Sequence, residues 1–177
     1  MDQKTKLKEK KMKNRKLTLY TTRGALIAAL YVLLTLLSSM MGLSSGVIQL
    51  RISEAMCILP IFMPEAIPGL FIGCLVSNLL SGGVVWDVVF GSIATLIGAI
   101  GARILKDLPH KQKWLATIPT ILANMIIVPF VLIYAYGAPD SYFFIAFTVG
   151  VGEIICAGFG GYGLYYTLSK TKIQWLK

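Results

Sequence analysis

The chain has 177 residues, of which 56% are hydrophobic and only 14% are charged. This balance excludes an ordinary soluble domain, in which roughly 25% of the residues are charged. The net charge is +9, but nine of the 17 Lys and Arg residues lie between positions 4 and 23. The excess charge therefore belongs to one segment. It does not indicate nucleic-acid binding, because no aromatic residue stands among these cations before Tyr20.

Residues 1–17 are predicted to form a basic, disordered cytoplasmic tail, and residues 18–177 a membrane domain. The tail can also be attracted to anionic membrane lipid. A first membrane span is predicted from about Leu19 to Met41. The apolar run that begins at Leu17 is too long for the core of a signal peptide, which has about 7 to 15 residues, and no cleavage site follows it.

Small residues give the first span a face that another helix can approach closely, namely Gly24, Ala25, Ala28 and Ala29. Their spacing of three and four residues places them on one side of a helix. The approaching helix can belong to this chain or to a partner protein. The spacing alone leaves both interpretations open.

A short second span is predicted to begin at Arg51, after a Gly/Ser-rich loop over residues 42–50. It ends between Pro60 and Pro64, because two prolines exclude a continuous helix. A membrane-crossing helix needs about 20 residues. We therefore expect this span to be tilted or to lie within the bundle.

Four further spans are predicted along the rest of the chain. The third ends at Leu80, before a tight turn over residues 81–83. An aqueous loop over residues 103–113 separates the fourth span from the fifth. The predicted limits are Glu65–Leu80, Val85–Leu105, Trp114–Tyr136 and Tyr142–Leu168. The predicted fold is an all-α integral membrane protein with a six-helix bundle.

The basic residues predict the orientation of this bundle. They gather in the N-terminal tail, in the loop over residues 103–113 and at the C-terminus. With six spans all three segments lie on one side, which the positive-inside rule assigns to the cytoplasm. Both termini are therefore expected to be cytoplasmic, in a multi-pass protein of the plasma membrane.

Polar residues inside the spans predict a binding site. A charged side chain in the bilayer costs about 2.5 to 3.5 kcal/mol on insertion scales, so such groups usually pair or bind something. The predicted topology places five of them near the outer face and two deeper. We therefore expect a polar funnel that admits a ligand from outside, with these candidate residues: Arg51, Glu54, Asn78, Trp86, Asp87, Asn124 and Glu153.

Structural explanations exist for most of these residues. Arg51 and Glu54 have the spacing of an ion pair on one helix face. Asp87 can cap the fourth span, with Trp86 in the aromatic belt at the membrane interface. The asparagines can join helices. Glu153 favours a ligand or cavity role most clearly, because no Lys or Arg lies near it in sequence.

Other site chemistries are not indicated. Cys57, Cys74 and Cys156 stand singly in apolar segments, without the spacing of metal ligands. The glycines between residues 150 and 163 lack the G-x-x-x-x-G-K-[ST] pattern of a phosphate-binding loop. His110 lies in a Lys-rich loop. We therefore predict no metal, no cofactor and no enzyme activity.

Several blocks of the sequence resemble a known family. They are RISEAMCILP, PEAIPGLFIGCLVSNLL, GGVVWDVVFGSIATL and ANMIIVP. With them, the chain resembles the queuosine-precursor transporter family (QueT) over roughly residues 18–168. This family comprises substrate-binding S components of energy-coupling factor (ECF) transporters.

The resemblance implies a six-helix S component that captures a 7-deazaguanine, a prequeuosine base or queuine, from outside. Such a subunit associates with a membrane-coupling T component and two cytoplasmic ATPases, and topples in the membrane to release substrate inside. Ala25 and Ala29 match the A-x-x-x-A pattern through which S components dock on the coupling protein.

The candidate residues also suit such a base chemically. Glu54 and Glu153 can accept from its ring N–H and amine groups or from a cationic side arm. Arg51 or Asn78 can donate to its carbonyl, and Trp86 can stack on its ring. Three alternatives stay open: an S component for another vitamin such as riboflavin or thiamine, a solitary proton-coupled carrier that uses Glu153, and an enzyme or structural membrane protein.

Overall fold

The computed structural model describes residues 3–44 and 48–171. Within these ranges the chain is largely helical and contains no β-strand, which confirms the predicted all-α class. The helices are α1 (Gln3–Met40), η1 (Ile52–Ile61), α2 (Ala66–Leu80), α3 (Val85–Ile104), η2 (Leu105–Asp107), η3 (His110–Thr117), α4 (Ile118–Tyr134), α5 (Tyr142–Glu153), η4 (Ile154–Gly160) and α6 (Gly161–Lys170).

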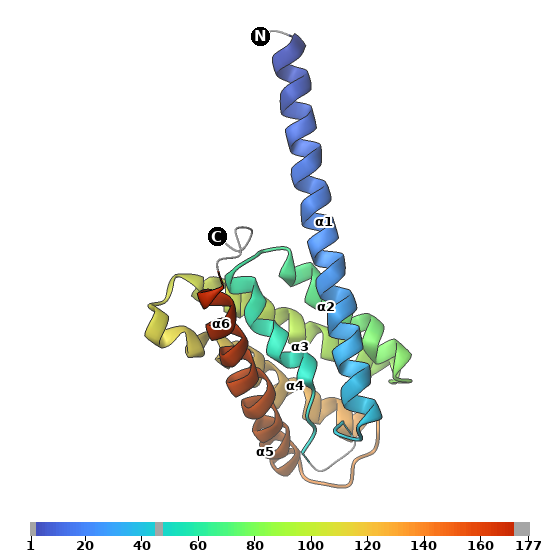
Figure 1. The fold of residues 1–177 in the computed structure, drawn as a ribbon. Helices are drawn as coiled ribbons and strands as arrows, with labels where there is room; N and C mark the ends of the chain where they lie inside the picture. Colours follow the sequence, from blue (N-terminus) through green and yellow to red (C-terminus); the bar gives the residue numbers. More distant parts are fainter. Residues whose placement is uncertain (1–2, 45–47, 172–177) are drawn as a thin grey trace.

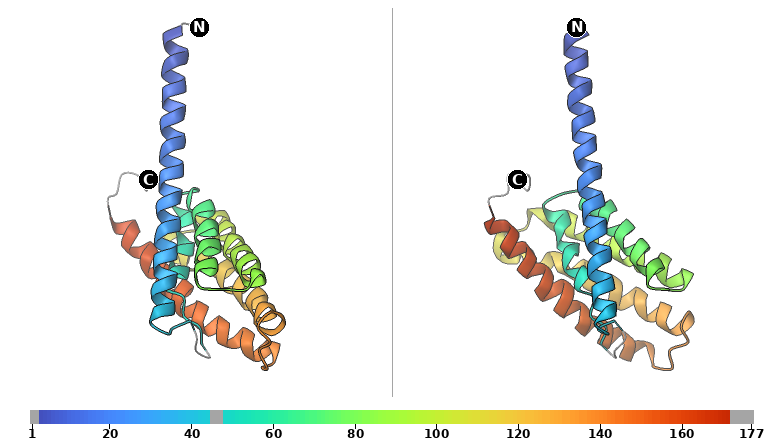
Figure 2. Two further views of the ribbon diagram at one scale, coloured as in Figure 1. Left: turned by 90° about the vertical axis from the view of Figure 1, so that its right-hand side faces the viewer. Right: turned by 45° about the vertical axis from the view of Figure 1, so that its right-hand side comes forward.

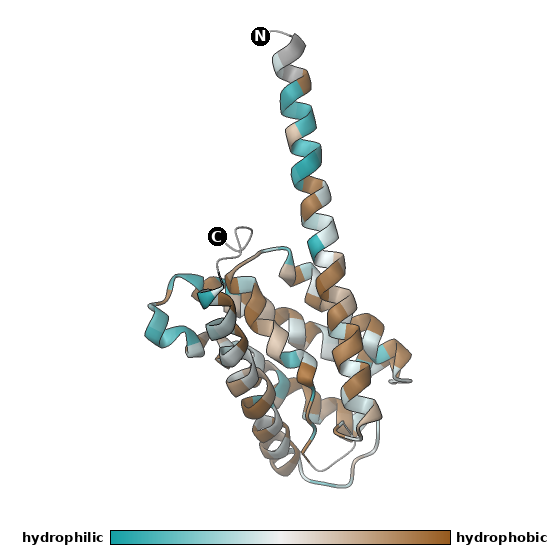
Figure 3. Ribbon diagram, in the orientation of Figure 1, coloured by the Kyte–Doolittle hydropathy of each residue, from teal (hydrophilic) through white to brown (hydrophobic). Residues whose placement is uncertain are grey.

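Helix α1 is 38 residues long, and its basic N-terminal half projects beyond the bundle (Figure 1). We expected residues 1–17 to be disordered, whereas residues 3–17 are helical here. The reason lies in the composition, because this segment contains no Gly or Pro and is rich in Lys, which favours helix. Figure 3 shows the hydrophilic half of α1 outside the bundle and the apolar half within it.

Helices α1 to α5 pack side by side in chain order, and η1 lies among α1, α3, η4 and α6. Two further views show α5 and α6 running as one tilted stretch past the other helices (Figure 2). A π-helical segment, η4, joins them directly after Glu153. Segments of this kind occur frequently at functional sites.

The second predicted span is the short 3₁₀ helix η1, and it lies within the bundle, as expected. Its 10 residues include a run of buried side chains from Met56 to Pro60. A 3₁₀ helix rises about 2.0 Å per residue, so η1 extends over roughly 20 Å, more than an α-helix of equal length. Arg51 lies directly before the first residue of η1.

Among the described residues, four helical stretches are long and apolar enough to cross a membrane: residues 7–40, 85–107, 110–134 and 142–170. Many large apolar side chains on these stretches are exposed, among them Leu33, Ile126 and Phe147, which is expected of a surface that faces lipid. Helices η1 and α2 are apolar but shorter, with 10 and 15 residues. The six-span count therefore remains a prediction.

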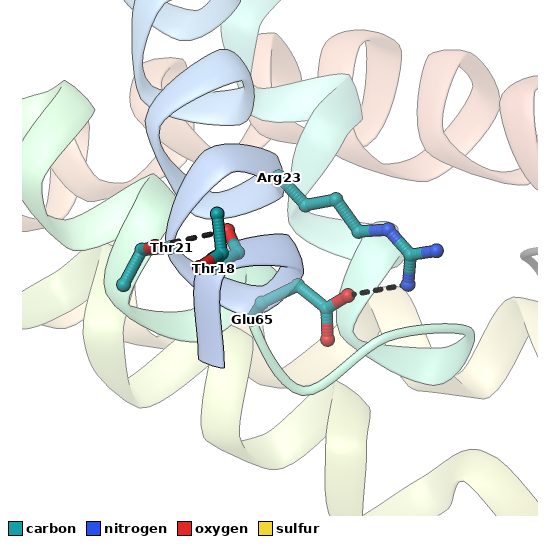
Figure 4. Close-up of polar contacts among 4 residues, drawn as sticks. All are labelled: Thr18, Thr21, Arg23 and Glu65. Atoms are coloured by element: carbon teal, nitrogen blue, oxygen red, sulfur yellow. Dashed lines mark hydrogen bonds and ion pairs between the residues drawn. The ribbon is translucent and has the colours of Figure 1, made fainter. Parts of the chain in front are cut away.

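Glycine permits close packing of α1 on α2. A Cβ atom on Gly69 would lie only 2.6 Å from the carbonyl oxygen of Gly24. The same pair of helices is joined by an ion pair between Arg23 and Glu65, with Nη1 and Oε1 3.1 Å apart (Figure 4). Glu65 is buried just before α2 begins, so the ion pair fixes the start of α2 against α1.

Candidate functional site

Arg51 lies at the centre of the polar residues. Its backbone is extended just before η1 begins. Its Nη1 atom donates to Oδ1 of Asn78 on α2, at 3.5 Å. The guanidinium interacts electrostatically with Asp87 most strongly and also with Glu54. Arg51 thus links three elements that are separate in sequence.

The turn between α2 and α3 brings Asn78 and Asp87 together. The Asn78 amide donates to the main-chain oxygen of Asp87 at 3.3 Å, and the Asn78 carbonyl accepts from Gly83 N at 2.9 Å. Tyr136, in the loop between α4 and α5, donates to Oδ2 of Asp87 at 3.1 Å. The same hydroxyl accepts from the Val84 N–H at 3.3 Å. Tyr136 therefore holds this loop against the start of α3.

These residues form one wall of a cavity of about 240 Å³, which we call the outer pocket. Its lining is mostly hydroxyl, amide and charged side chains, in contrast to the apolar bundle around it. The lining residues are Thr35, Ser39, Ser44, Arg51, Asn78, Ser81, Gly83, Asp87 and Tyr136. Arg51, Asn78 and Asp87 were predicted from the sequence. Tyr136 and the hydroxyl residues were missed, although serines at the end of the first span were a signal.

A second cavity of about 20 Å³, which we call the inner cavity, shares Arg51 with the outer pocket. Arg51 lines both cavities, and the inner one also includes Gln49, Asn124 and Glu153. Glu153 is 8% exposed, and its Oε2 atom has no hydrogen-bond partner among the described residues. The structure therefore places the two deep candidates, Asn124 and Glu153, in one cavity beside Arg51.

Gly152 allows the segment before η1 to pack closely on α5. A Cβ atom at this position would lie 2.1 Å from the main-chain oxygen of Gln49. The extended segment before η1 consequently packs directly on α5, one residue from Glu153. A side chain at position 152 would therefore push the Gln49 segment away from α5.

Glu54 lines neither cavity. It is 2% exposed, and both of its carboxylate oxygens already accept, one from the Tyr31 hydroxyl and the other from Cys57 Sγ at 3.2 Å. Its electrostatic partners include Arg51 and Glu153. Glu54 is therefore a buried carboxyl group beside the site, with both oxygens already hydrogen-bonded.

Trp86 lies apart from the other candidates. Its side chain is 62% exposed and stacks on Phe90, with ring centroids 5.9 Å apart. It lines a separate apolar groove of about 550 Å³ between α3 and α4, together with Phe130 and Tyr134. The first turn of α3 directs Trp86 outward, so its predicted role as a stacking platform in the polar pocket has no support from its position.

The apolar grooves on the bundle surface are larger than the outer pocket but offer few polar groups. In the part of the chain that the structure describes, no three His, Cys, Asp or Glu side chains are grouped to hold a metal ion. The two adjoining polar cavities are therefore the candidate site for an organic ligand with hydrogen-bonding groups.

Residues 21–170 match the family model of the QueT transporter. A stretch of 74 residues is 40% identical to the protein named "Queuosine precursor transporter QueT" of Lactococcus lactis subsp. cremoris (strain MG1363). The stretch covers 41% of this chain and 43% of that relative, so less than half of the relative's length is matched. No solved structure matches the chain.

The family match and the four long apolar helices together identify a multi-pass protein of the plasma membrane. The chain belongs to the QueT transporter family.

Proposed function

We propose that this protein captures a 7-deazaguanine queuosine precursor, a prequeuosine base or queuine, from outside the cell and delivers it to the cytoplasm. The observation that carries the proposal is the outer pocket, a polar cavity of about 240 Å³ in an apolar bundle. Its volume is below the ~300 to 1,000 Å³ of typical drug-sized sites, which suits a single bicyclic base. The name of the Lactococcus relative supports the same class of ligand.

The hydrogen-bonding groups at the pocket complement such a base. Arg51 and Asn78 can donate to the ring carbonyl, and the Asp87 carboxylate can accept from ring N–H and amine groups. A carboxylate can accept two parallel bonds from neighbouring donors on one ring edge. The pocket therefore offers hydrogen-bond donors, on Arg51 and Asn78, close to an acceptor, the Asp87 carboxylate.

The topology that accompanies this proposal has six spans, with η1 as the second and α2 as the third. Helix α1 projects from the same end of the bundle at which α6 terminates and η2 and η3 lie (Figure 1). That end carries the basic residues, which supports a cytoplasmic location for both termini. The outer pocket is then on the extracellular side.

We assign the chain the role of an ECF S component, which works with a T component and two cytoplasmic ATPases. The sequence contains no phosphate-binding loop of its own. Ala25 and Ala29 are exposed, whereas Gly24 and Ala28 face α2. Packing inside the bundle thus accounts for Gly24 and Ala28, and leaves Ala25 and Ala29 available to a partner helix.

A solitary proton-coupled carrier is the second candidate, because Glu153 is a buried carboxyl with an unsatisfied oxygen. An S component for another vitamin is the third. Co-purification with ATPase subunits distinguishes an S component from a solitary carrier.

The substrate is tested by calorimetric titration of the full-length protein in detergent. The ligands are prequeuosine bases, queuine, guanine, riboflavin and thiamine. The proposal predicts that at least one 7-deazaguanine binds ten times or more tightly than guanine or either vitamin, a difference of about 1.4 kcal/mol. Folded protein that binds riboflavin or thiamine instead, or binds no ligand of the panel, contradicts it.

A further inference from the structure

On the basis of the proposed function, we infer that the inner cavity is a subsite for a small protonated side arm of the base. Glu153 is then the residue that selects a 7-aminomethyl group over an uncharged group at the same ring position. The ring occupies the outer pocket, and the ammonium reaches past Arg51 to the Glu153 carboxylate.

The first argument is charge. The site combines one guanidinium, that of Arg51, with the three carboxylates of Glu54, Asp87 and Glu153. The guanidinium interacts electrostatically with Asp87, Glu54 and Glu153, and one positive charge cannot neutralise three carboxylates. Uncompensated buried charge is costly. A ligand that brings one positive charge reduces the imbalance.

The second argument is hydrogen bonding. Glu54 already accepts through both oxygens, from Tyr31 and Cys57. Glu153 has an oxygen, Oε2, that is buried and without a partner among the described residues. A carboxylate of this kind is completed by a donor, and a protonated amine provides three. Of these two carboxylates, Glu153 is therefore the one that can receive the side arm.

The third argument is size. The inner cavity measures about 20 Å³, and a single water molecule needs about 10 to 15 Å³. An ammonium group is close to water in size and fits. A bicyclic ring does not fit, and neither does the cyclopentenediol that queuine carries on its amine.

The fourth argument is geometry within the ligand. In a 7-deazaguanine the substituent at position 7 lies beside the ring carbonyl. Arg51 lines both cavities, so one guanidinium that donates to the carbonyl stands next to the path of the side arm. The two contacts are consistent with a single placement of the ring.

The experiment compares two bases that differ only in charge at this position, 7-aminomethyl-7-deazaguanine and 7-cyano-7-deazaguanine. Both are titrated into the full-length wild-type protein and into Glu153→Gln. The matched control is Glu9→Gln, which makes the same chemical change on the exposed part of α1. Queuine is added as a test of size.

In the wild-type protein and in Glu9→Gln, the aminomethyl base is expected to bind at least ten times more tightly than the cyano base. Queuine is expected to bind at least ten times more weakly than the aminomethyl base. In Glu153→Gln the preference for the aminomethyl base falls to less than threefold, because only its affinity drops.

Equal affinity of the wild-type protein for the aminomethyl and cyano bases overturns the inference and leaves the proposed function intact. An equal loss of both affinities in Glu153→Gln also overturns it, because Glu153 would then act on the ring or the fold. Absence of binding by every 7-deazaguanine refutes the proposed function itself. The comparison of the two bases in the wild-type protein needs no variant, so it tests the inference even if Glu153→Gln does not fold.

Discussion

Arg51 is the residue at which the two polar cavities meet, and its contacts show how separate parts of the sequence form one site. Its Nη1 atom donates to Asn78 on α2, and its guanidinium interacts electrostatically with Asp87 on α3. The inner cavity adds Asn124 from α4 and Glu153 from α5. Helices α2, α3, α4 and α5 thus each contribute a polar group, and each such group would cost free energy if it faced lipid without a partner.

Tyr136 gives a prediction at the residue scale. Replacing it by Phe removes the hydroxyl that joins Asp87 and Val84, so the loop between α4 and α5 is held less firmly over the outer pocket. We expect Tyr136→Phe to accelerate ligand dissociation about threefold or more, with little change in the unfolding temperature, because an exposed hydrogen bond contributes little stability.

The measurement is the dissociation rate of a labelled base from each purified variant. Tyr134→Phe is the matched control, because Tyr134 is exposed and lines the apolar groove instead of the pocket. Equal rates for Tyr136→Phe and the control would show that Tyr136 does not close the pocket.

Single residues also show what the sequence could predict. Arg51, Asn78, Asp87, Asn124 and Glu153 were recognisable because a polar group in an apolar span requires a reason. Tyr136 was not, because a tyrosine near a span end is ordinary at a membrane interface. The side chain of Trp86 points outward because of the rotation of α3, which residue spacing in the sequence does not reveal. The spacing also does not reveal that the Tyr31 hydroxyl already donates to Glu54.

At the scale of elements, proline and glycine determined most of the predicted limits. The structure has α2 ending at Leu80, α3 beginning at Val85 and α5 beginning at Tyr142, all as predicted. The 3₁₀ form of η1 and the π-helical form of η4 were not predicted, because both result from packing within the bundle. Residues 3–17 are helical and not disordered as predicted, because a basic segment without Gly or Pro still favours helix.

The contact of α1 with α2 gives a prediction at this scale. Gly69→Ala places a Cβ atom 2.6 Å from the Gly24 carbonyl oxygen, so the two helices must separate. Such overpacking costs about 1 to 3 kcal/mol of stability. We expect a clear fall in the thermal unfolding temperature in detergent.

Gly163→Ala is the matched control, because no described atom lies within 4 Å of a Cβ atom there. It lies inside α6, where alanine favours the helix by up to about 1 kcal/mol. This variant is therefore expected to keep or raise the unfolding temperature. Equal unfolding temperatures for the two variants would contradict the close contact at Gly69.

At the scale of the whole molecule, the bundle separates its polar interior from its exposed surfaces. The two cavities lie among α1 to α5, whereas Ala25 and Ala29 face away from α2 on the surface of α1. If the proposed function is correct, ligand binding and partner docking can therefore be altered independently. This separation is what a subunit that binds substrate and is driven by others requires.

Ala29→Phe tests the docking surface. The added ring prevents close approach of a partner helix, so we expect uptake by cells that supply the T component and ATPases to fall at least tenfold. Ligand binding to the purified protein is expected to stay within twofold of the wild type, because Ala29 lines neither cavity.

Val89→Phe, at an exposed position of α3, is the control for added bulk. Its uptake is expected to match the wild type. Normal uptake by Ala29→Phe would favour a solitary carrier, or a docking surface elsewhere on the bundle.

The most direct measurement of the central claim, that the polar pocket around Arg51 binds the base, is the affinity of Arg51→Gln for the best-bound 7-deazaguanine. Hydrogen bonds to charged groups contribute about 1.5 to 3 kcal/mol, so we predict a loss of affinity of tenfold or more. Arg51→Lys should lie between this variant and the wild type, and Arg15→Gln, in the exposed part of α1, should bind as the wild type does. Wild-type affinity in folded Arg51→Gln would contradict the account.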